Sequence, residues 1–232
     1  MINKATLNVV MLIYPNMTQL DLTGPFEVFS SFKELQIHLV WKDMAPVRDV
    51  NGLAILPTVS MAQCPQADIL FVPGGAGQLP LMEDEEVLTF LRGQAQTALY
   101  VTSVCTGSLI LAAAGLLTGY RATCHWLSLN QLAFFNVEPV NQRVVIDGNR
   151  VTGAGVTSGI DFALSLMAEV FGTERAKLAQ LRMEYDPAPP FIGGSPAKAE
   201  PELVAQVREL TCSFQQQREQ IAKKVAAKLI QP

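Results

Sequence analysis

Apolar stretches recur along the chain and alternate with segments in which apolar and polar residues follow helical spacing. Thr6–Tyr14 (TLNVVMLIY) is almost wholly apolar, as is typical of a strand buried on both faces of a sheet. Strands that alternate with helices favour an α/β fold, with a mostly parallel sheet and helices on both faces. We expect strands at Thr6–Tyr14, Leu35–Trp41, Asp68–Val72 and Ala98–Thr102, and helices at Pro25–Phe32, Asp84–Gln96, Leu109–Leu117, His125–Phe135, Ile160–Phe171 and Thr173–Tyr185.

Turn residues and a long amphipathic stretch complete the pattern. Asn51-Gly52 and Asp147-Gly148-Asn149 lie between β-type residues and predict two hairpins, whereas Pro187–Pro196 is too rich in proline and glycine to be regular. A last helix is expected from near Pro201, because apolar residues then recur at steps of three and four, with Gln217 as an interruption. This stripe contains Leu203, Val207, Leu210, Phe214, Ile221, Val225 and Leu229.

The pattern predicts two parts. Residues 1–190 form one α/β domain, and residues 191–232 form a proline- and glycine-rich segment followed by an amphipathic helix that packs on the domain or on a partner subunit. The length of 232 residues, with 49% hydrophobic and 16% charged residues, fits a folded chain and not a disordered one.

Charge and cysteine usage narrow the classes of partner. The formal net charge of −4 does not favour nucleic acid or an anionic membrane surface, and no segment is typical of a signal peptide or a membrane span, so we expect a cytoplasmic protein. Cys64, Cys105, Cys124 and Cys212 are scattered without a CxxC pair, which favours reduced thiols over a zinc site. We expect neither a metal nor an organic cofactor.

The stretch around Cys105 carries the strongest chemical signal. A β-type run stops at this cysteine, and small residues then open an apolar helix, as in the strand–turn–helix context of a nucleophile elbow. Backbone N–H groups and the helix dipole at such a turn favour thiolate, which is both a nucleophile and a leaving group. Cysteines are also often inert core residues, and this alternative stays open at this point.

Other candidate groups lie in loops that parallel strands bring to one edge of the sheet. Asp21 is either a simple helix N-cap or a carboxyl group that faces Cys105, where a dry pocket would raise its pKa and let it act as a general acid. Gly74–Gly77 is either a structural turn or a source of backbone donors, and the candidate backbone groups are those of Gly75, Ala76 and Thr106. It lacks the spacing of a nucleotide-binding loop.

Thr106 and His125 have two interpretations each, and Val156 is a further candidate. The Thr106 hydroxyl either faces the helix N-terminus or hydrogen-bonds the reacting group. His125 is either structural or, if near Cys105, part of a Cys–His pair. Val156 lies next to the start of a helix and is a candidate pocket residue.

Several segments resemble the ThiJ/PfpI superfamily. They are QLDLTGPFEVF (Gln19–Phe29), FVPGG (Phe71–Gly75), YVTSVCTGSLILAAAGLLTGYRATCHW (Tyr100–Trp126) and TGAGVTSGIDFAL (Thr152–Leu164). The resemblance implies a flavodoxin-like domain with a cysteine at the elbow, and a homodimer. It also implies that Cys105 is the nucleophile, Asp21 the acid/base group and Thr106 a hydrogen-bonding partner.

Departures from other members favour the isocyanide-hydrating branch of this superfamily. PfpI-type proteases carry histidine where this chain has Thr106, deglycase and chaperone-like members usually carry glutamate at the place of Asp21, and AraC-type regulators append a helix-turn-helix pair that the last forty or so residues do not resemble. The resemblance implies that Cys105 attacks a small-molecule isocyanide to give a thioimidate, and that water then releases a formamide. The alternative is a redox or stress sensor, a deglycase or a holdase built on the same thiol.

Overall fold

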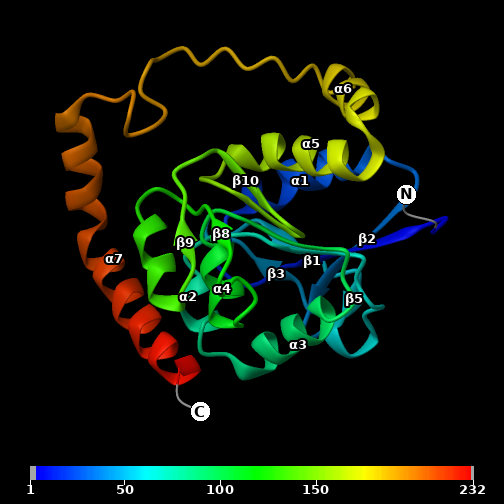
Figure 1. The fold of residues 1–232 in the computed structure, drawn as a ribbon, viewed down its shortest axis with the longest axis horizontal. Coiled ribbons are helices and arrows are strands. Elements are labelled where there is room, and N and C mark those ends of the chain that lie inside the picture. Colours follow the sequence, from blue (N-terminus) through cyan, green and yellow to red (C-terminus); the bar gives the residue numbers. More distant parts are fainter. Residues whose placement is uncertain (1–3, 231–232) are drawn as a thin grey trace.

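The computed structural model describes residues 4–230, and a mostly parallel sheet forms the centre of this part of the chain (Figure 1). The strand order is β10-β11-β7-β6-β1-β2-β5, and every neighbouring pair is parallel except β10 with β11. The strands are β1 (Leu7–Leu12), β2 (Leu35–Trp41), β5 (Val59–Ser60), β6 (Ile69–Val72), β7 (Tyr100–Val104), β10 (Val144–Asp147) and β11 (Arg150–Gly153). The strand order and the covering helices confirm the flavodoxin-like α/β fold.

Helices cover both faces of the sheet. In Figure 1, α1, α5 and α6 lie above it, and α2, α3 and α4 lie below it. The helices are α1 (Gln19–Ser30), α2 (Gln78–Leu81), α3 (Glu85–Ala95), α4 (Gly107–Ala113), α5 (Ser158–Phe171), α6 (Thr173–Arg182) and α7 (Pro201–Ile230), with 3-10 helices η1 (Met61–Gln63) and η2 (Leu129–Phe135). Short strands pair outside the main sheet: β3 (Val47–Arg48) with β4 (Ala54–Ile55), and β8 (Arg121–Ala122) with β9 (Glu138–Pro139).

Aromatic packing joins the sheet to the α1–α5 layer. Phe29 of α1, Phe71 of β6 and Phe162 of α5 are fully buried, with ring centroids 5.7–6.5 Å apart. The two helices approach closely because glycine stands at the contacts: a Cβ on Gly159 would lie 3.0 Å from Pro25 Cδ. No described helix is both long and apolar enough to cross a bilayer.

Helix α1 begins earlier than the sequence predicts. It starts at Gln19 instead of near Pro25, so Pro25 is inside the helix and Thr18 is the N-cap residue. The interpretation of Asp21 as an N-cap is therefore wrong. The polar and turn-prone residues before Pro25 favour a loop by propensity, but burial of this segment against α5 and the sheet edge overrides that preference.

Other predicted elements differ in detail. Helix α2 is absent from the prediction, since four residues are too few for a periodic pattern, and the short helix expected within His125–Phe135 is a 3-10 helix over Leu129–Phe135. Both hairpin turns are confirmed, with Gly52 and Gly148 at positive φ.

Helix α7 packs on the body through its second half. Arg218, Ala222, Val225 and Ala226 are buried there, whereas Leu210 in the first half is largely exposed although it belongs to the predicted apolar stripe. An irregular connector, residues 183–200, runs from α6 to α7 along the outside of the molecule (Figure 1).

The fold places three loops at one edge of the sheet. In parallel α/β sheets, ligands bind beyond the carboxyl ends of the strands where the strand order reverses. Here that point lies between β1 and β6, and the segments that follow β1, β6 and β7 carry Asp21, Gly74 and Cys105.

Candidate active site

Cys105 occupies a sharp turn between β7 and α4. Its φ of 55° lies in the left-handed region, which non-glycine residues adopt only where the surrounding structure enforces it. The backbone N–H of Cys105 donates to the carbonyls of both Gly153 and Ala154, at 3.0 and 2.8 Å, and these bonds hold the turn. The residue is 5% exposed, so the thiol lies in the interior of the protein.

Asp21 approaches Cys105 from helix α1. Its carboxyl is fully buried, and Oδ2 accepts a hydrogen bond of 3.1 Å from the N–H of Gly74. Gly74 lies between the reacting groups, since a Cβ on it would be 2.7 Å from Cys105 Cβ, 2.8 Å from Asp21 Oδ2 and 2.6 Å from Thr106 N. Oδ1 of Asp21 has no hydrogen-bond partner among the described residues.

Burial controls the protonation of this pair. It raises the pKa of Asp21 to about 7, although interactions with the Cys105 thiol and the Gly74 N–H favour the ionised carboxylate. It also raises the pKa of the Cys105 thiol well above its usual value, and the nearby Asp21 carboxylate acts in the same direction. The helix N-terminus predicted a lowered pKa for this thiol, and that prediction is wrong. The cost of burying the thiolate charge exceeds the favourable effect of the Thr106 backbone N–H.

Thr106 connects the elbow to the glycine loop. Its hydroxyl accepts a 3.0 Å hydrogen bond from the Gly75 N–H and donates to the Gly75 carbonyl at 3.3 Å. The Gly75 N–H is therefore engaged by Thr106 in this structure. Gly75 has a φ of 133° and forms a bridge with Met17, so a side chain there would meet backbone. Ala76, half-buried, follows in the same loop.

His125 and Val156 lie in the segments flanking the elbow. Burial lowers the pKa of His125 to about 4, so its imidazole is neutral near pH 7, and its Nδ1 accepts a 3.3 Å hydrogen bond from the Leu127 N–H. Its ring also lies against Gly155, in the loop after β11. Val156 is half-buried in that loop, and its pocket role stays a prediction.

Sequence reasoning missed two groups that interact with the pair, Tyr14 and Arg218. Tyr14, just after the end of β1, donates from its hydroxyl to the Pro73 carbonyl at 2.8 Å. Arg218 of α7 is 4% exposed and donates to Gln78 Oε1 at 2.8 Å and Ser128 Oγ at 2.9 Å. A signal for Arg218 was present, because it lies on the apolar stripe between Phe214 and Ile221.

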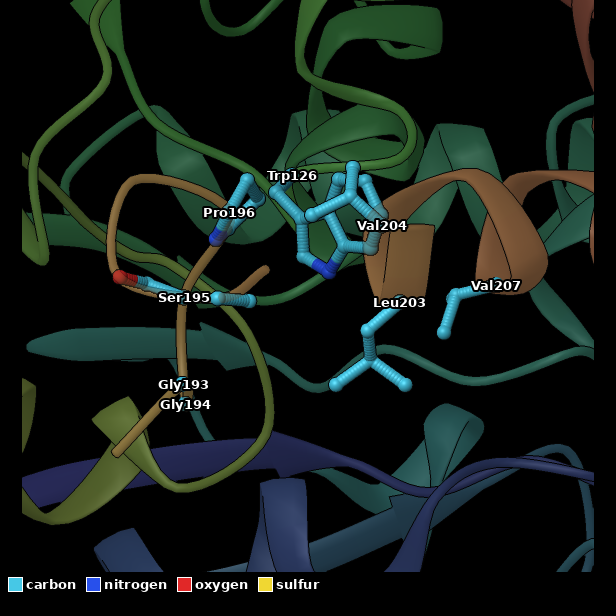
Figure 2. Close-up of a pocket in the computed structure, with 9 residues that line it drawn as sticks. Trp126, Gly193, Gly194, Ser195, Pro196, Leu203, Val204 and Val207 are labelled. Atoms are coloured by element: carbon cyan, nitrogen blue, oxygen red, sulfur yellow. The ribbon is translucent and has the colours of Figure 1, made fainter. Parts of the chain in front are cut away.

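An apolar hollow of about 180 Å³ lies apart from these groups. It is lined by Trp126, the connector residues 193–196 and 199, and Leu203, Val204 and Val207 of α7. Figure 2 shows Trp126 beside Val204, with the connector passing on the other side. Cys105, Asp21 and Thr106 do not line it. Within residues 4–230, no cluster of three or more His, Cys, Asp or Glu side chains could hold a metal ion.

The chain is similar in sequence and in structure to several known proteins. It is 51% identical to isonitrile hydratase from Pseudomonas putida, over 96% of this chain and 98% of that protein. It is 33% identical to the HTH-type transcriptional regulator GbdR of Pseudomonas aeruginosa, over 74% of this chain but only 49% of the regulator. The crystal structure of a ThiJ/PfpI family protein from Pseudomonas syringae superposes with a TM-score of 0.92 at 45% identity, covering 94% of this chain and 91% of that one. The sequence pattern of the DJ-1/PfpI family matches residues 7–169, and the chain therefore belongs to that family.

Proposed function

We propose that this protein is an isocyanide (isonitrile) hydratase that converts an isocyanide and water into an N-substituted formamide. The observation that carries the proposal is the burial of Cys105 and the Asp21 carboxyl together around Gly74, where the pKa of Asp21 is about 7. The near full-length similarity to the Pseudomonas putida hydratase supports the same reaction. Because the terminal carbon of an isocyanide must gain both a nucleophile and a proton, the pair supplies what the first step requires.

The first step forms the covalent intermediate. Before this step, the Cys105 thiol and the Asp21 carboxyl share one proton, so the pair carries a single negative charge. The Cys105 sulfur attacks the terminal carbon of R–N≡C and forms the C–S bond, while Asp21 delivers the proton to the same carbon. The product is a thioimidate, R–N=CH–S–Cys105, with Asp21 left as a carboxylate.

The second step consumes water. The Asp21 carboxylate removes a proton from water as the water oxygen bonds to the thioimidate carbon, and Asp21 then passes that proton to the nitrogen. The C–S bond then breaks, the sulfur leaves as thiolate, and the hydroxyl proton returns to the pair as the formamide R–NH–CHO departs. Thr106, which is fixed by Gly75, orients the intermediate. We place the half-buried Ala76 and Val156, and the neutral His125, at the margin of the pocket.

A turnover assay with an aromatic isocyanide tests the proposal. Wild-type protein should produce the formamide, and its mass spectrum during turnover should show a substrate-sized adduct on the Cys105 peptide. Cys105→Ala should fold and lose turnover, whereas Cys212→Ala, which removes an exposed thiol from α7, should keep it. Normal turnover by Cys105→Ala would contradict covalent catalysis.

Parallel assays separate the hydratase from its alternatives. Methylglyoxal loss measures deglycase or glyoxalase chemistry, and peroxide treatment followed by mass spectrometry measures oxidation of Cys105 to a sulfinic acid. We expect turnover of the isocyanide alone. Turnover of neither substrate, with ready oxidation of Cys105, would instead favour a redox sensor.

We also propose a cytoplasmic homodimer. Four large apolar side chains of α6 and the connector are exposed, and a second copy would cover them: Leu178, Leu181, Phe191 and Ile192. The four cysteines are all free, which supports a reducing compartment.

A further inference from the structure

Arg218 is a buried cation without a buried anion beside it. It is 4% exposed, and its hydrogen-bond partners, Gln78 and Ser128, are both neutral. Its guanidinium lies 4.5 Å from the centre of the Phe214 ring. No carboxylate of residues 4–230 lies within 4.0 Å of it. An unpaired charge in the interior is costly, so the fold must compensate Arg218 with a more distant negative charge.

Among the titratable groups around Arg218, one source remains for a compensating negative charge. Tyr14 and Cys124 are neutral near pH 7, because burial raises both pKa values, to about 12 for Cys124. His125 is neutral as well, with a pKa of about 4. The Cys105–Asp21 pair remains, since the pKa of Asp21 is about 7.

Neighbouring charges on α7 are already paired. Glu219 binds Lys223 one turn further along the helix, and Lys224 binds Glu83 on the segment before α3. Neither pair leaves a carboxylate for Arg218. The positive charge of Arg218 nevertheless interacts electrostatically with Cys124, Cys105 and Tyr14.

A chain of contacts also joins Arg218 to the acid/base group. Gln78, which receives the Arg218 Nε–H, begins helix α2 directly after the Gly74–Gly77 loop. The first N–H of that loop, from Gly74, holds Asp21. Arg218 therefore contributes a charge and also fixes the loop on which Asp21 depends.

We propose that Arg218 is a positioning residue whose buried positive charge balances the single negative charge shared by Cys105 and Asp21. The catalytic role of Arg218 rests on the proposed function. In that reaction the Cys105 thiolate, stabilised by the Arg218 charge, is the nucleophile of the first step and the leaving group of the last. Helix α7 supplies this group from outside residues 7–169, the part of the chain that the family pattern matches.

Alkylation of Cys105 by iodoacetamide tests the charge without any isocyanide. Peptide mass spectrometry gives the rate at Cys105 alone between pH 6 and pH 10, and only thiolate reacts. In Arg218→Met the rate at pH 8 should fall about tenfold, the change that one unit of pKa produces. In Arg218→Lys, which keeps the charge, most of the rate should return.

Arg208→Met is the matched control. Arg208 is an exposed arginine on the same helix and also lies over an aromatic ring, Trp126, at 5.8 Å. Its alkylation curve should match that of the wild type. In the turnover assay, Arg218→Met should lower kcat with little change in KM.

A wild-type alkylation curve in folded Arg218→Met would overturn the inference, and so would an equal loss of rate in Arg218→Lys. If Arg218→Met does not fold, Arg218→Gln carries the test with the same outcomes, because glutamine keeps polar contacts while removing the charge. Loss of isocyanide turnover in the wild type would refute the proposed function and leave the alkylation result intact.

Discussion

At the scale of single residues, the Asp21 carboxyl is held where its protonation changes near neutral pH. Its pKa is about 7 in the folded protein and about 3.9 in an unfolded chain. Between about pH 4 and 7 the Asp21 carboxyl is therefore ionised in the unfolded chain but still protonated in the folded protein. The free energy of unfolding therefore falls as pH rises from about 4 to 7, by a few kcal/mol at about 1.4 kcal/mol per unit.

Asp21→Asn should remove this dependence. The variant should gain stability relative to the wild type at pH 8 and much less at pH 4, and turnover should fall by at least about 10²-fold because the proton donor is lost. Urea unfolding at the two pH values checks the first result, and the pH–rate profile checks the second. Equal stability differences at both pH values would show that Asp21 does not hold a proton in the folded state.

Position 74 has no room for a side chain, because atoms of three residues lie close to the α-carbon of Gly74. In Gly74→Ala the new Cβ would meet Thr106 N, Cys105 Cβ and Asp21 Oδ2 at 2.6–2.8 Å, so the pair must separate. We expect turnover to fall by about 10²-fold, the effect of a displacement near 1 Å. Gly93→Ala is the control: nothing lies within 4 Å of its Cβ position in α3, and it should gain about 0.5–1 kcal/mol of stability with normal turnover.

The sequence permitted some of these assignments and not others. Cys105, Asp21 and Thr106 lie in short segments whose residue types resemble a known family, and the structure brings all three together around Gly74. Tyr14 could not be singled out from the sequence, because it continues an apolar run. Only the structure shows that its hydroxyl donates to the Pro73 carbonyl. The thiol pKa also required the structure, since sequence does not report burial.

At the scale of elements, helix α5 fixes the layer that carries Asp21. Phe162 packs its ring against Phe29 of α1 and Phe71 of the sheet. Phe162→Ala should destabilise the protein by about 3–5 kcal/mol through the cavity it leaves. Chemical denaturation measures the loss, and Leu53→Ala, at an exposed position, should change stability by less than about 0.5 kcal/mol. A small loss in Phe162→Ala would mean that α5 can collapse onto the sheet.

Elements with strong periodicity were predictable, and their ends were not. The buried strands and the helices α3 and α5 follow from apolar runs and amphipathic spacing, and Asp84 caps α3 with a hydrogen bond from Val87 N–H. The start of α1 and the whole of α2 depend on tertiary packing, which local residue preferences do not encode.

At the scale of the whole molecule, large apolar side chains are exposed on α6 and on the connector that leads to α7. Phe191 and Ile192 are 83% and 88% exposed on the connector. A double Phe191→Ser, Ile192→Ser variant should weaken the proposed dimer, whereas Leu56→Ser, at another exposed apolar position, should not. Light scattering after gel filtration measures the mass of each. A monomeric wild type would contradict the dimer.

The boundary at residue 190 stays a prediction, and the structure gives it a physical context. Helix α7 is joined to the rest by an irregular connector, yet its second half is buried against the body and contributes Arg218 beside the active site. Sequence periodicity predicted the helix but not how much of its apolar stripe is buried, because Leu210 in the first half is exposed whereas Val225 in the second half is buried.

The φ of 55° at Cys105 has a consequence for how such a chain evolves. Glycine would occupy that turn with less conformational penalty than any residue that has a side chain. If mutation proceeded without selection for turnover, folding alone would favour replacement of the cysteine by glycine. Retention of a thiol at this position across descendants would therefore record continued use of its chemistry, and its loss would mark the lineages in which that use had ceased.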